Sequence, residues 1–519
     1  MDPGELPRDN DGWNAFPRET ADPEESLSHT RKTTRHVVHA LSYAARIPVI
    51  SRYFGRLCVV AAVLIVVPLL VCLLYGDVST AVRYAIVAAG VFLLGMLLSR
   101  IPGPDDVQTN EAMVVAAMIF LFTPLSLTWP AMAAGLSFQD ALFETVSGVT
   151  TTGLTTVGSV SAMPDPFLFA RAWMQWIGGL GIVVLSLAVM IRPGRAAKRM
   201  GDLEDYEADL VGGTRANARR VLGVYAVLTG SAVLLLGVVG GGGLEAVLYA
   251  FAAVSTGGFS PHDASMAGLR GPWTQAVLIF FSTAGAVSLI TYYRIRREGW
   301  RALPRDRQLG LMLGLACSAS LLLALIFWRN GAGPWQALRH GALNAFSAQT
   351  TTGFASVDLA GGGTAAKLVL LFSMFVGGGI GSTAGGIKIL RLMIVLRVLQ
   401  LLIRKTSEPR RAVTDVRIGG ERLDPEEIQN ALGLVVLFVG VAFLSWVPFV
   451  AAGKDPVDSL FEVVSALGTV GLSTGITRAG LHPLLKAVLC ADMLLGRLEI
   501  LAWLVLLYPG TWAGRKRRA

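Results

Sequence analysis

The stretch DALFETVSGVTTTGLT, residues 140–155, decides the fold because its pattern occurs four times in the chain. The other copies are EAVLYAFAAVSTGGFS (245–260), HGALNAFSAQTTTGFA (340–355) and DSLFEVVSALGTVGLS (458–473). Each copy begins with a short apolar segment and continues into a Thr- and Gly-rich stretch. The fourteenth residue of every copy is a glycine: Gly153, Gly258, Gly353 and Gly471. We therefore expect four short helices, each followed by extended chain, that surround one axis.

The composition indicates a membrane protein that crosses the bilayer many times. Of the 519 residues, 53% are hydrophobic and 16% are charged, whereas a soluble protein carries about a quarter charged residues. A helix that spans a bilayer needs roughly 20 apolar residues. Apolar runs near this length recur at 57–75, 85–99, 112–127, 222–239, 309–328, 368–387, 432–450 and 488–507.

The net charge of +9 is explained by membrane topology rather than by nucleic acid. Basic residues cluster at 192–220, 294–307, 391–422 and 515–518, while 131–166 and 241–269 contain no Lys or Arg. This alternation is the positive-inside bias of membrane proteins, so we expect no nucleic-acid partner. The four cysteines stand at unrelated spacings, which argues against a zinc site or a disulfide framework.

The lengths of the apolar segments predict the topology. The helical parts of the four copies, at 140–150, 245–255, 340–350 and 458–468, are half of what a crossing requires, so we expect them to be re-entrant pore helices. Each lies between two spans, and a further hairpin precedes the first copy. The predicted fold is an all-α polytopic membrane protein with ten transmembrane helices and four re-entrant pore helices. An even number of crossings and basic flanks at both ends predict two cytoplasmic termini in the cytoplasmic (inner) membrane.

The repeats divide the chain into six regions. These are a polar cytoplasmic segment (1–54), a transmembrane hairpin (55–103), a first pore unit (104–212), a second (213–304), a third with an intramembrane loop (305–424), and a fourth with a basic tail (425–519).

The residues around each glycine have the composition of a cation selectivity filter. Backbone carbonyls can replace the hydration shell of an ion when the chain runs extended, and glycine permits the positive-φ conformations that this requires. A tight helix-packing surface is the alternative, but four equivalent copies favour the filter. The predicted potassium-binding residues are Thr151, Thr152, Gly153, Leu154, Thr256, Gly257, Gly258, Phe259, Thr351, Thr352, Gly353, Phe354, Thr469, Val470, Gly471 and Leu472.

Acidic residues begin three of the four copies: Asp140, Glu245 and Asp458. They could concentrate cations at the mouth of a pore. They could equally cap the pore helices and complement the helix dipoles. The sequence leaves both interpretations open.

A glycine-rich segment interrupts the second helix of the third unit, in MFVGGGIGSTAGGIK (374–388). Six glycines within ten residues cannot sustain a helix, because each costs about 1 kcal/mol relative to alanine. We expect a loop that acts as a gate; the alternative is a packing surface in which Lys388 extends to the cytoplasmic face. The predicted gate consists of Gly377, Gly378, Gly379, Gly381, Ser382, Thr383, Gly385, Gly386 and Lys388, with Arg497.

Arg497 lies near the middle of the last apolar run, in MLLGRLEI (493–500). An ionisable side chain at this depth is a functional hypothesis by default. We expect it to face the pore below the filter, where its charge opposes cation passage. A buried ion pair with another helix is the alternative, and Asp492 and Glu499 stand at unfavourable spacings for a pair on the same helix face.

Together, the four filter segments, the GGGIGSTAGGIK loop, the GRLE helix and WIGGLGIVVLS (176–186) resemble the TrkH branch of the Trk/Ktr/HKT potassium-transporter superfamily over residues 57–512. The resemblance implies potassium uptake through a pseudo-fourfold pore, with potassium as the transported ion and no organic cofactor. It also implies a homodimer in the lipid bilayer and a cytosolic TrkA-type regulatory subunit that binds NAD or ATP. Sodium-preferring relatives carry Ser at the first filter glycine, so Gly153 favours potassium. The segment IFFSTAGAVSLITYY (279–293) departs from the family pattern.

Two other functions are less compatible with the sequence. An ion-coupled secondary transporter of potassium or sodium built from inverted repeats would need an odd number of crossings in each repeat, whereas each unit here starts and ends on the same side. An intramembrane enzyme would need a nucleophile and a base in reach of each other. All six histidines fall in the N-terminal segment or in the predicted outer loops, so we expect no enzyme.

Overall fold

The computed structural model describes residues 44–104, 106–190, 214–240, 242–407, 415–418 and 421–513. The chain divides into two units, one formed by residues 47–508 and the other by the two chain ends. Most of the predicted polar segment 1–54 and the basic tail at 515–518 lie outside the described residues. In the unit of chain ends, the Ala45 N–H donates to the Thr511 carbonyl at 2.8 Å, and a short helix, α21 (Pro509–Ala513), ends the described chain.

A helical hairpin comes first in the larger unit. It consists of α2 (Ile47–Leu74) and α3 (Val78–Ser99), so α2 begins earlier than the predicted boundary at residue 55. Asp77 caps α3 by accepting a hydrogen bond from the Thr80 N–H at 3.0 Å. A Cβ atom added to Gly55 would lie 2.8 Å from the Gly95 carbonyl oxygen. Small residues therefore allow the two backbones to approach closely, as in other helix pairs in membranes.

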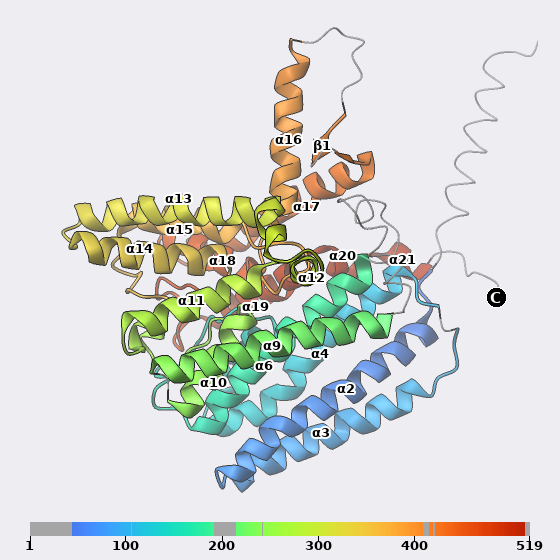
Figure 1. Cartoon of the computed structure of the whole chain (residues 1–519). Helices are drawn as coiled ribbons and strands as arrows, with labels where there is room; N and C mark the ends of the chain where they lie inside the picture. Colours follow the sequence, from blue (N-terminus) through green and yellow to red (C-terminus); the bar gives the residue numbers. More distant parts are fainter. Residues whose placement is uncertain are drawn as a thin grey trace, which may run out of the picture. The chain divides into compact units, whose positions relative to one another are not determined.

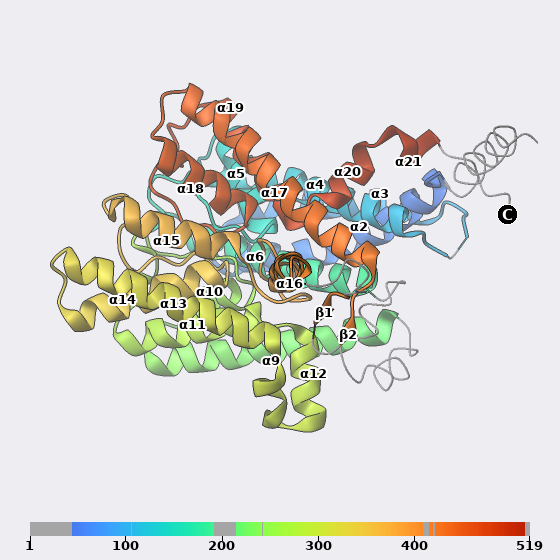
Figure 2. The same cartoon turned by 90° about the horizontal axis from the view of Figure 1, so that it is seen from above.

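Four units of the same design follow the hairpin (Figures 1 and 2), each with a first helix, a short helix and a second helix. We keep the name pore helix, taken from the sequence prediction, for the short helices. The first helices are α4 (Thr109–Ala131), α9 (Thr214–Val239), α13 (Arg307–Arg329) and α17 (Pro425–Ala451). The pore helices are α5 (Phe138–Val149), α10 (Gly243–Val254), α14 (Pro334–Gln349) and α18 (Pro456–Leu467). The second helices are α6 (Asp165–Met190), α11 (Pro272–Ala286), α15 (Gly363–Phe375) and α19 (Pro483–Arg497).

The second helices are continuous in the first unit and broken in the other three. The bend after α11 measures 94° and leads into α12 (Leu289–Glu298). The glycine-rich segment separates α15 from α16 (Ile389–Lys405). The last break separates α19 from α20 (Leu501–Leu507), where Glu499 and Ile500 both have positive φ. The sequence predicted the break in the third unit and missed the other two.

The count of ten transmembrane helices stays a prediction, because these breaks leave some second helices too short to be recognised as full spans. Among the described residues, seven helices are long and apolar enough to cross a membrane, or eight if the bent pair α11 and α12 counts as one span. Here α15 and α19 have 13 and 15 residues and fall short of a full crossing. The multi-pass character that the composition predicted is confirmed.

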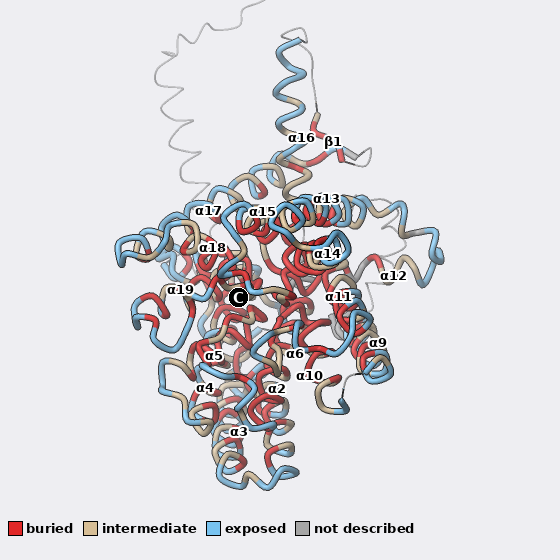
Figure 3. Tube along the Cα trace, turned by 90° about the vertical axis from the view of Figure 1, so that its left-hand side faces the viewer, coloured by how far each residue is buried: buried red, intermediate tan, exposed pale blue. Residues whose placement is uncertain are grey.

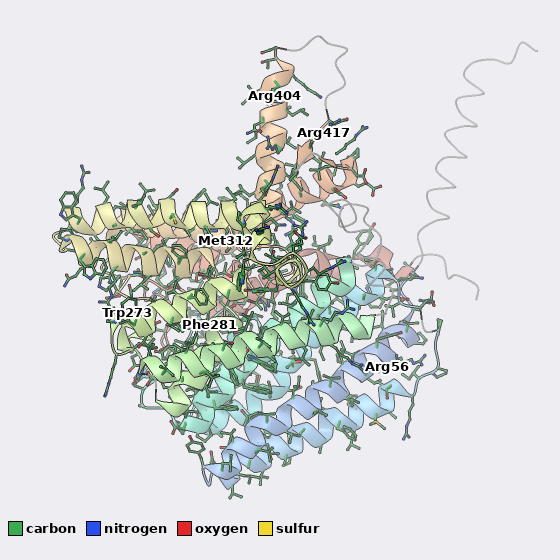
Figure 4. All side chains as sticks on the ribbon, viewed as in Figure 1. Arg56, Trp273, Phe281, Met312, Arg404 and Arg417 are labelled. Atoms are coloured by element: carbon green, nitrogen blue, oxygen red, sulfur yellow. The ribbon has the colours of Figure 1, made fainter. Side chains whose placement is uncertain are left out.

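Burial in the larger unit follows what a bilayer requires (Figure 3). Large apolar side chains on the outer helices are exposed, including Val63 (61%), Leu234 (71%) and Leu444 (70%). Such exposure is costly in water and favourable against lipid tails. On α11, the labelled Phe281 is buried while Trp273 is exposed (Figure 4). The pore helices, by contrast, are mostly buried.

The remaining elements connect the units. Helix α16 extends away from the bundle (Figure 1) and packs Ile394 against Val416, Ile418, Leu423 and Ala431. Ile418 belongs to a small antiparallel pair, β1 (Arg417–Ile418) with β2 (Glu421–Arg422), and Val416 and Leu423 flank this pair. Three short 3₁₀ helices complete the larger unit: η1 (Met132–Ala134), η2 (Ser265–Gly268) and η3 (Trp300–Arg305).

Candidate functional site

The four glycine-containing segments form one closed ring. At each of the four glycines, an added Cβ atom would lie less than 3.0 Å from a backbone carbonyl oxygen of the next unit. The oxygen always belongs to the residue just before that unit's own glycine. The pairs are Gly153 with Gly257, Gly258 with Thr352, Gly353 with Val470, and Gly471 with Thr152. The last pair returns to the first unit, so four stretches far apart in sequence meet around one axis.

Each segment of the ring carries the same unusual backbone conformation. A threonine two residues before the glycine has positive φ: Thr151 (53°), Thr256 (52°), Thr351 (53°) and Thr469 (49°). The glycines follow at 94°, 76°, 83° and 94°. Left-handed conformations are rare for threonine because it is β-branched. Such strain concentrates at functional sites, where the surrounding structure fixes it. The sequence predicted positive φ at the glycines and gave no signal of it at the threonines.

Hydrogen bonds from the pore helices fix the inner end of the ring segments. In the first unit, the Thr152 N–H donates to the Ser147 carbonyl at 2.9 Å, and the Gly153 N–H donates to the Ser147 hydroxyl at 3.0 Å. In the fourth unit, Ser465 makes the same bonds to Val470 and Gly471 at 2.8 and 3.1 Å. The chain therefore reverses tightly as it leaves each of these helices.

A second set of polar residues, which the sequence reasoning missed, holds the outer end of the segments. Each stands nine residues before the glycine and bonds to a residue two or three positions after it. Glu144 accepts from the Thr155 hydroxyl at 2.7 Å and the Thr156 N–H at 2.8 Å. The remaining contacts are Tyr249 with Ser260 at 2.9 Å, Asn344 with Ser356 at 3.0 Å, and Glu462 with Ser473 at 2.6 Å and Thr474 at 2.8 Å. Aligning the four copies would have found this position, because it is polar in all of them.

The three acidic residues that begin the copies are each paired with a basic residue. Asp140 accepts from Lys486 and Asp458 from Lys367, both at 2.6 Å, and Glu245 lies 2.8 Å from His262. The two lysines come from the second helix of the preceding unit in the ring. Asp140 and Asp458 therefore join neighbouring units, whereas Glu245 and His262 belong to the same unit. The caps of α5 and α18 are Ser137 and Asp455 instead.

The glycine-rich segment lies directly against the ring. Its ends are joined by hydrogen bonds from Gly377 to Ile387 (2.9 Å) and from Ile387 to Phe375 (3.1 Å). Within it, the Gly385 N–H donates to the Thr351 hydroxyl at 2.8 Å. The Thr383 hydroxyl lies 3.2 Å from the Thr256 hydroxyl and donates to the Val254 carbonyl at 3.1 Å. The loop thus contacts the ring segments of the second and third units.

Lys388 and Arg497 both point toward this loop. The Lys388 ammonium is buried and donates to the Ala384 carbonyl. Arg497 is 3% exposed and donates to the Thr383 carbonyl at 2.8 Å and the Gly178 carbonyl at 3.1 Å. Within the described ranges, no carboxylate forms an ion pair with Arg497.

The acidic neighbours of Arg497 have other partners. Glu499 pairs with Arg391 at the start of α16. Asp492 accepts from the Ser445 hydroxyl of α17 at 2.6 Å. Arg497 is therefore a buried cation held by carbonyl groups of two other units. Its partners Gly178 and Thr383 lie against Val149 and Val254, the last residues of α5 and α10.

Two buried hydroxyls of the ring lack a protein partner. The Thr151 and Thr469 hydroxyl oxygens form no hydrogen bond with any described residue. The equivalent oxygens of Thr256 and Thr351 contact the glycine-rich loop. Buried polar atoms without partners are costly, so their presence in this ring suits a site that coordinates a cation through oxygen atoms.

Comparison with known families agrees with this geometry. The model of the TrkH family, described as cation transport proteins, matches residues 91–328 and 335–509. The chain belongs to the TrkH family. Membership confirms the resemblance found in the sequence and the prediction of a transport protein rather than an enzyme.

Individual relatives extend the match to almost the full chain. The Trk system potassium uptake protein TrkH of Halomonas elongata is 30% identical over 488 residues, covering 89% of this chain and 98% of the relative. The protein of the same name from Escherichia coli K12 is 26% identical over 486 residues, covering 89% and 99%. The crystal structure of the potassium transporter TrkH from Vibrio parahaemolyticus superposes with a TM-score of 0.81 at 24% identity, covering 90% of this chain and all of that one. The fold is therefore that of a TrkH protein.

Proposed function

We propose that this chain takes up potassium through a selectivity filter formed by its four glycine-containing segments. The observation that carries the proposal is the closed ring. In it, each glycine lies against the carbonyl oxygen of the residue just before the corresponding glycine of the next unit. Rings of inward-facing carbonyls are how proteins replace the hydration shell of potassium. The names of the relatives, which are potassium uptake proteins, support the same ion.

The oxygen ligands come from two layers of the ring. Backbone carbonyls along 151–154, 256–259, 351–354 and 469–472 supply most of them. The threonine hydroxyls supply a further layer, and the unpartnered oxygens of Thr151 and Thr469 support this assignment. The pore helices end beneath the ring, so their C-terminal partial negative charges favour a cation at that level.

The glycine-rich loop and Arg497 form the barrier to conduction. The loop contacts the hydroxyls of Thr256 and Thr351, so the closed arrangement occupies two oxygens of the threonine layer. The positive charge of Arg497, held against Thr383 and Gly178, opposes cation entry from below. Opening then requires the loop to leave the ring, and the hydrogen bond from Arg497 to Thr383 resists this movement.

The surroundings of the pore follow from the family. We assign the chain to the cytoplasmic membrane, as a homodimer regulated by a cytosolic nucleotide-binding subunit. The relatives are named as proteins of a Trk system, and this name supports the proposal that the chain functions together with other protein components. The hydrogen bond between Ala45 and Thr511 supports placing both chain ends on one side, which we assign to the cytoplasm because of the flanking basic residues.

The test of this proposal is ion flux in reconstituted vesicles. The wild-type protein should conduct potassium in preference to sodium. Gly153→Ser should lower the potassium-to-sodium flux ratio at least about tenfold, because a side chain at this position meets the Gly257 carbonyl. A wild-type protein without potassium flux, or an unchanged preference in the variant, contradicts the assignment.

A further inference from the structure

The second segment of the ring differs from the other three at two positions. Where the first, third and fourth copies carry Ser147, Ser347 and Ser465 in the pore helix, the second carries Ala252. Just before the filter glycine, the other copies carry Thr, Thr and Val, whereas the second carries Gly257. It therefore lacks the serine hydroxyl that accepts from the filter glycine in the first and fourth copies, and it lacks a side chain just before the glycine.

Gln175 of α6, in the first unit, occupies the missing volume. A Cβ atom added to Gly257 would lie 2.8 Å from the Gln175 side-chain nitrogen and closer still to the rest of its carboxamide. The same carboxamide is fully buried, donates to the Gly257 carbonyl and accepts from the Phe259 N–H at 3.0 Å. One side chain thus makes a hydrogen bond on each side of Gly258.

The residue one turn earlier on α6 reinforces this contact. The Arg171 guanidinium lies 3.8 Å from the centre of the Phe259 ring and donates to Glu144 at 3.0 Å. Glu144 in turn holds the outer end of the first filter segment. Two side chains of one helix therefore join the first and second filter segments. In the first and fourth units, by contrast, the filter segment is bonded to a serine of its own pore helix.

We propose that Gln175 is a positioning residue that sets ion selectivity by holding the second filter segment from the neighbouring unit. It replaces the support that serine gives in the first and fourth copies and that threonine gives in the first and third. Gly257 is a glycine because Gln175 fills its space. This role rests on the proposed filter. A buried glutamine that merely fills space would give the protein stability without affecting the choice of ion.

The second copy already contains a hydroxyl group that could bond to a threonine placed at position 257. In the first and third copies, the threonine before the glycine bonds to a second threonine two residues earlier, with Thr150 to Thr152 and Thr350 to Thr352 both at 2.8 Å. The second copy has a hydroxyl at the corresponding position, Ser255. A threonine placed at position 257 could therefore make the bond found in the other copies, provided that the Gln175 side chain is removed.

The experiment measures potassium and sodium flux of the full-length protein in reconstituted vesicles, together with its thermal stability. Gln175→Met keeps the volume of the side chain and removes both hydrogen bonds. It should lower the potassium-to-sodium ratio about tenfold, the factor that one lost buried hydrogen bond corresponds to. Gly257→Thr should abolish potassium flux. Gln175→Ala combined with Gly257→Thr should restore potassium flux, with a potassium-to-sodium ratio above that of Gln175→Ala alone.

Gln275→Ala is the matched control. Gln275 is also a buried glutamine on a second helix, but it bonds to the Met266 carbonyl at 2.9 Å and to Arg339 at 2.8 Å, away from the filter. This variant should lose stability and keep the ion ratio. A wild-type ratio in Gln175→Met overturns the inference and leaves the proposed function intact, provided that wild type prefers potassium. If Gly257→Thr fails to fold, the Gln175→Met ratio alone decides.

Discussion

The ring of glycine-containing segments and the second helices next to it come from the same four repeats but have diverged to different extents. In the ring, the φ values of the four threonines lie between 49° and 53°, and each glycine meets the same atom of its neighbour. Next to it, one second helix is continuous and three are broken by different means. The proposed function accounts for this difference: an ion that contacts all four units at once requires them to be nearly equivalent, whereas a barrier requires a contribution from only one or two units.

Replacing one of the four glycines by alanine tests whether the four segments of the ring must be equivalent, and should have the largest effect. Gly353→Ala puts a Cβ atom against the Val470 backbone carbonyl, which cannot move without distorting the fourth segment. We expect potassium flux to fall at least 100-fold, the cost of about 3 kcal/mol. Gly433→Ala on α17, where no atom lies within 4 Å, is the control and should conduct normally. Normal flux in Gly353→Ala would mean that the ring tolerates unequal segments.

Breaking a contact between units should affect stability more than conduction. Lys486→Met leaves the Asp140 carboxylate without its cation in a site where the lysine is 6% exposed. Removing one partner of a buried pair costs about 3–5 kcal/mol, which a thermal melt of the purified protein should register. The double change with Asp140→Leu should recover much of the loss. The exposed pair of Arg305 with Glu298, at 3.9 Å, provides the control: Arg305→Ala should cost less than about 1 kcal/mol.

Weakening the barrier should raise flux without altering selectivity. Arg497→Ala removes both the bond to Thr383 that holds the loop and the positive charge below the filter. We expect potassium flux to rise about tenfold, the effect of removing one charge-assisted hydrogen bond, with an unchanged potassium-to-sodium ratio. Arg397→Ala on α16, an exposed arginine bonded to Gln400, should leave flux as it is. A loss of selectivity in Arg497→Ala would place this residue in the filter instead.

The smallest effect concerns the outer loops of the first two units. Burial alone would raise the pKa of Asp263, but hydrogen bonds from Ser159, Val160 and Ser161 hold this pKa below its ordinary value. Its contribution to stability is therefore present above the unfolded pKa of about 3.9 and is lost as the pH falls through the folded pKa. Asp263→Asn should cost less than about 1 kcal/mol at pH 7 because the group is exposed. The melting-temperature difference from wild type should shrink toward pH 3; a constant difference would contradict the titration.

The sequence predicted the parts of the site that repeat. The four glycines, the short pore helices and the glycine-rich loop were found because spacing and composition recur or depart sharply from their surroundings. The positive φ of Thr151 and its counterparts has no compositional signal. Gln175 and Lys486 act on residues 82 and 346 positions away, a distance at which one sequence gives no local pattern. The break at Glu499 and Ile500 contains no glycine, which explains why a propensity argument missed it.

The measurement that most directly tests the four-unit ring is the potassium-to-sodium flux ratio of four single variants in reconstituted vesicles: Gly153→Ser, Gly258→Ser, Gly353→Ser and Gly471→Ser. Each glycine meets the same carbonyl of the next unit, so all four variants should lose preference for potassium by a similar factor. A wild-type ratio in any one of them would show that its segment lies outside the filter and would contradict the closed ring as the source of selectivity.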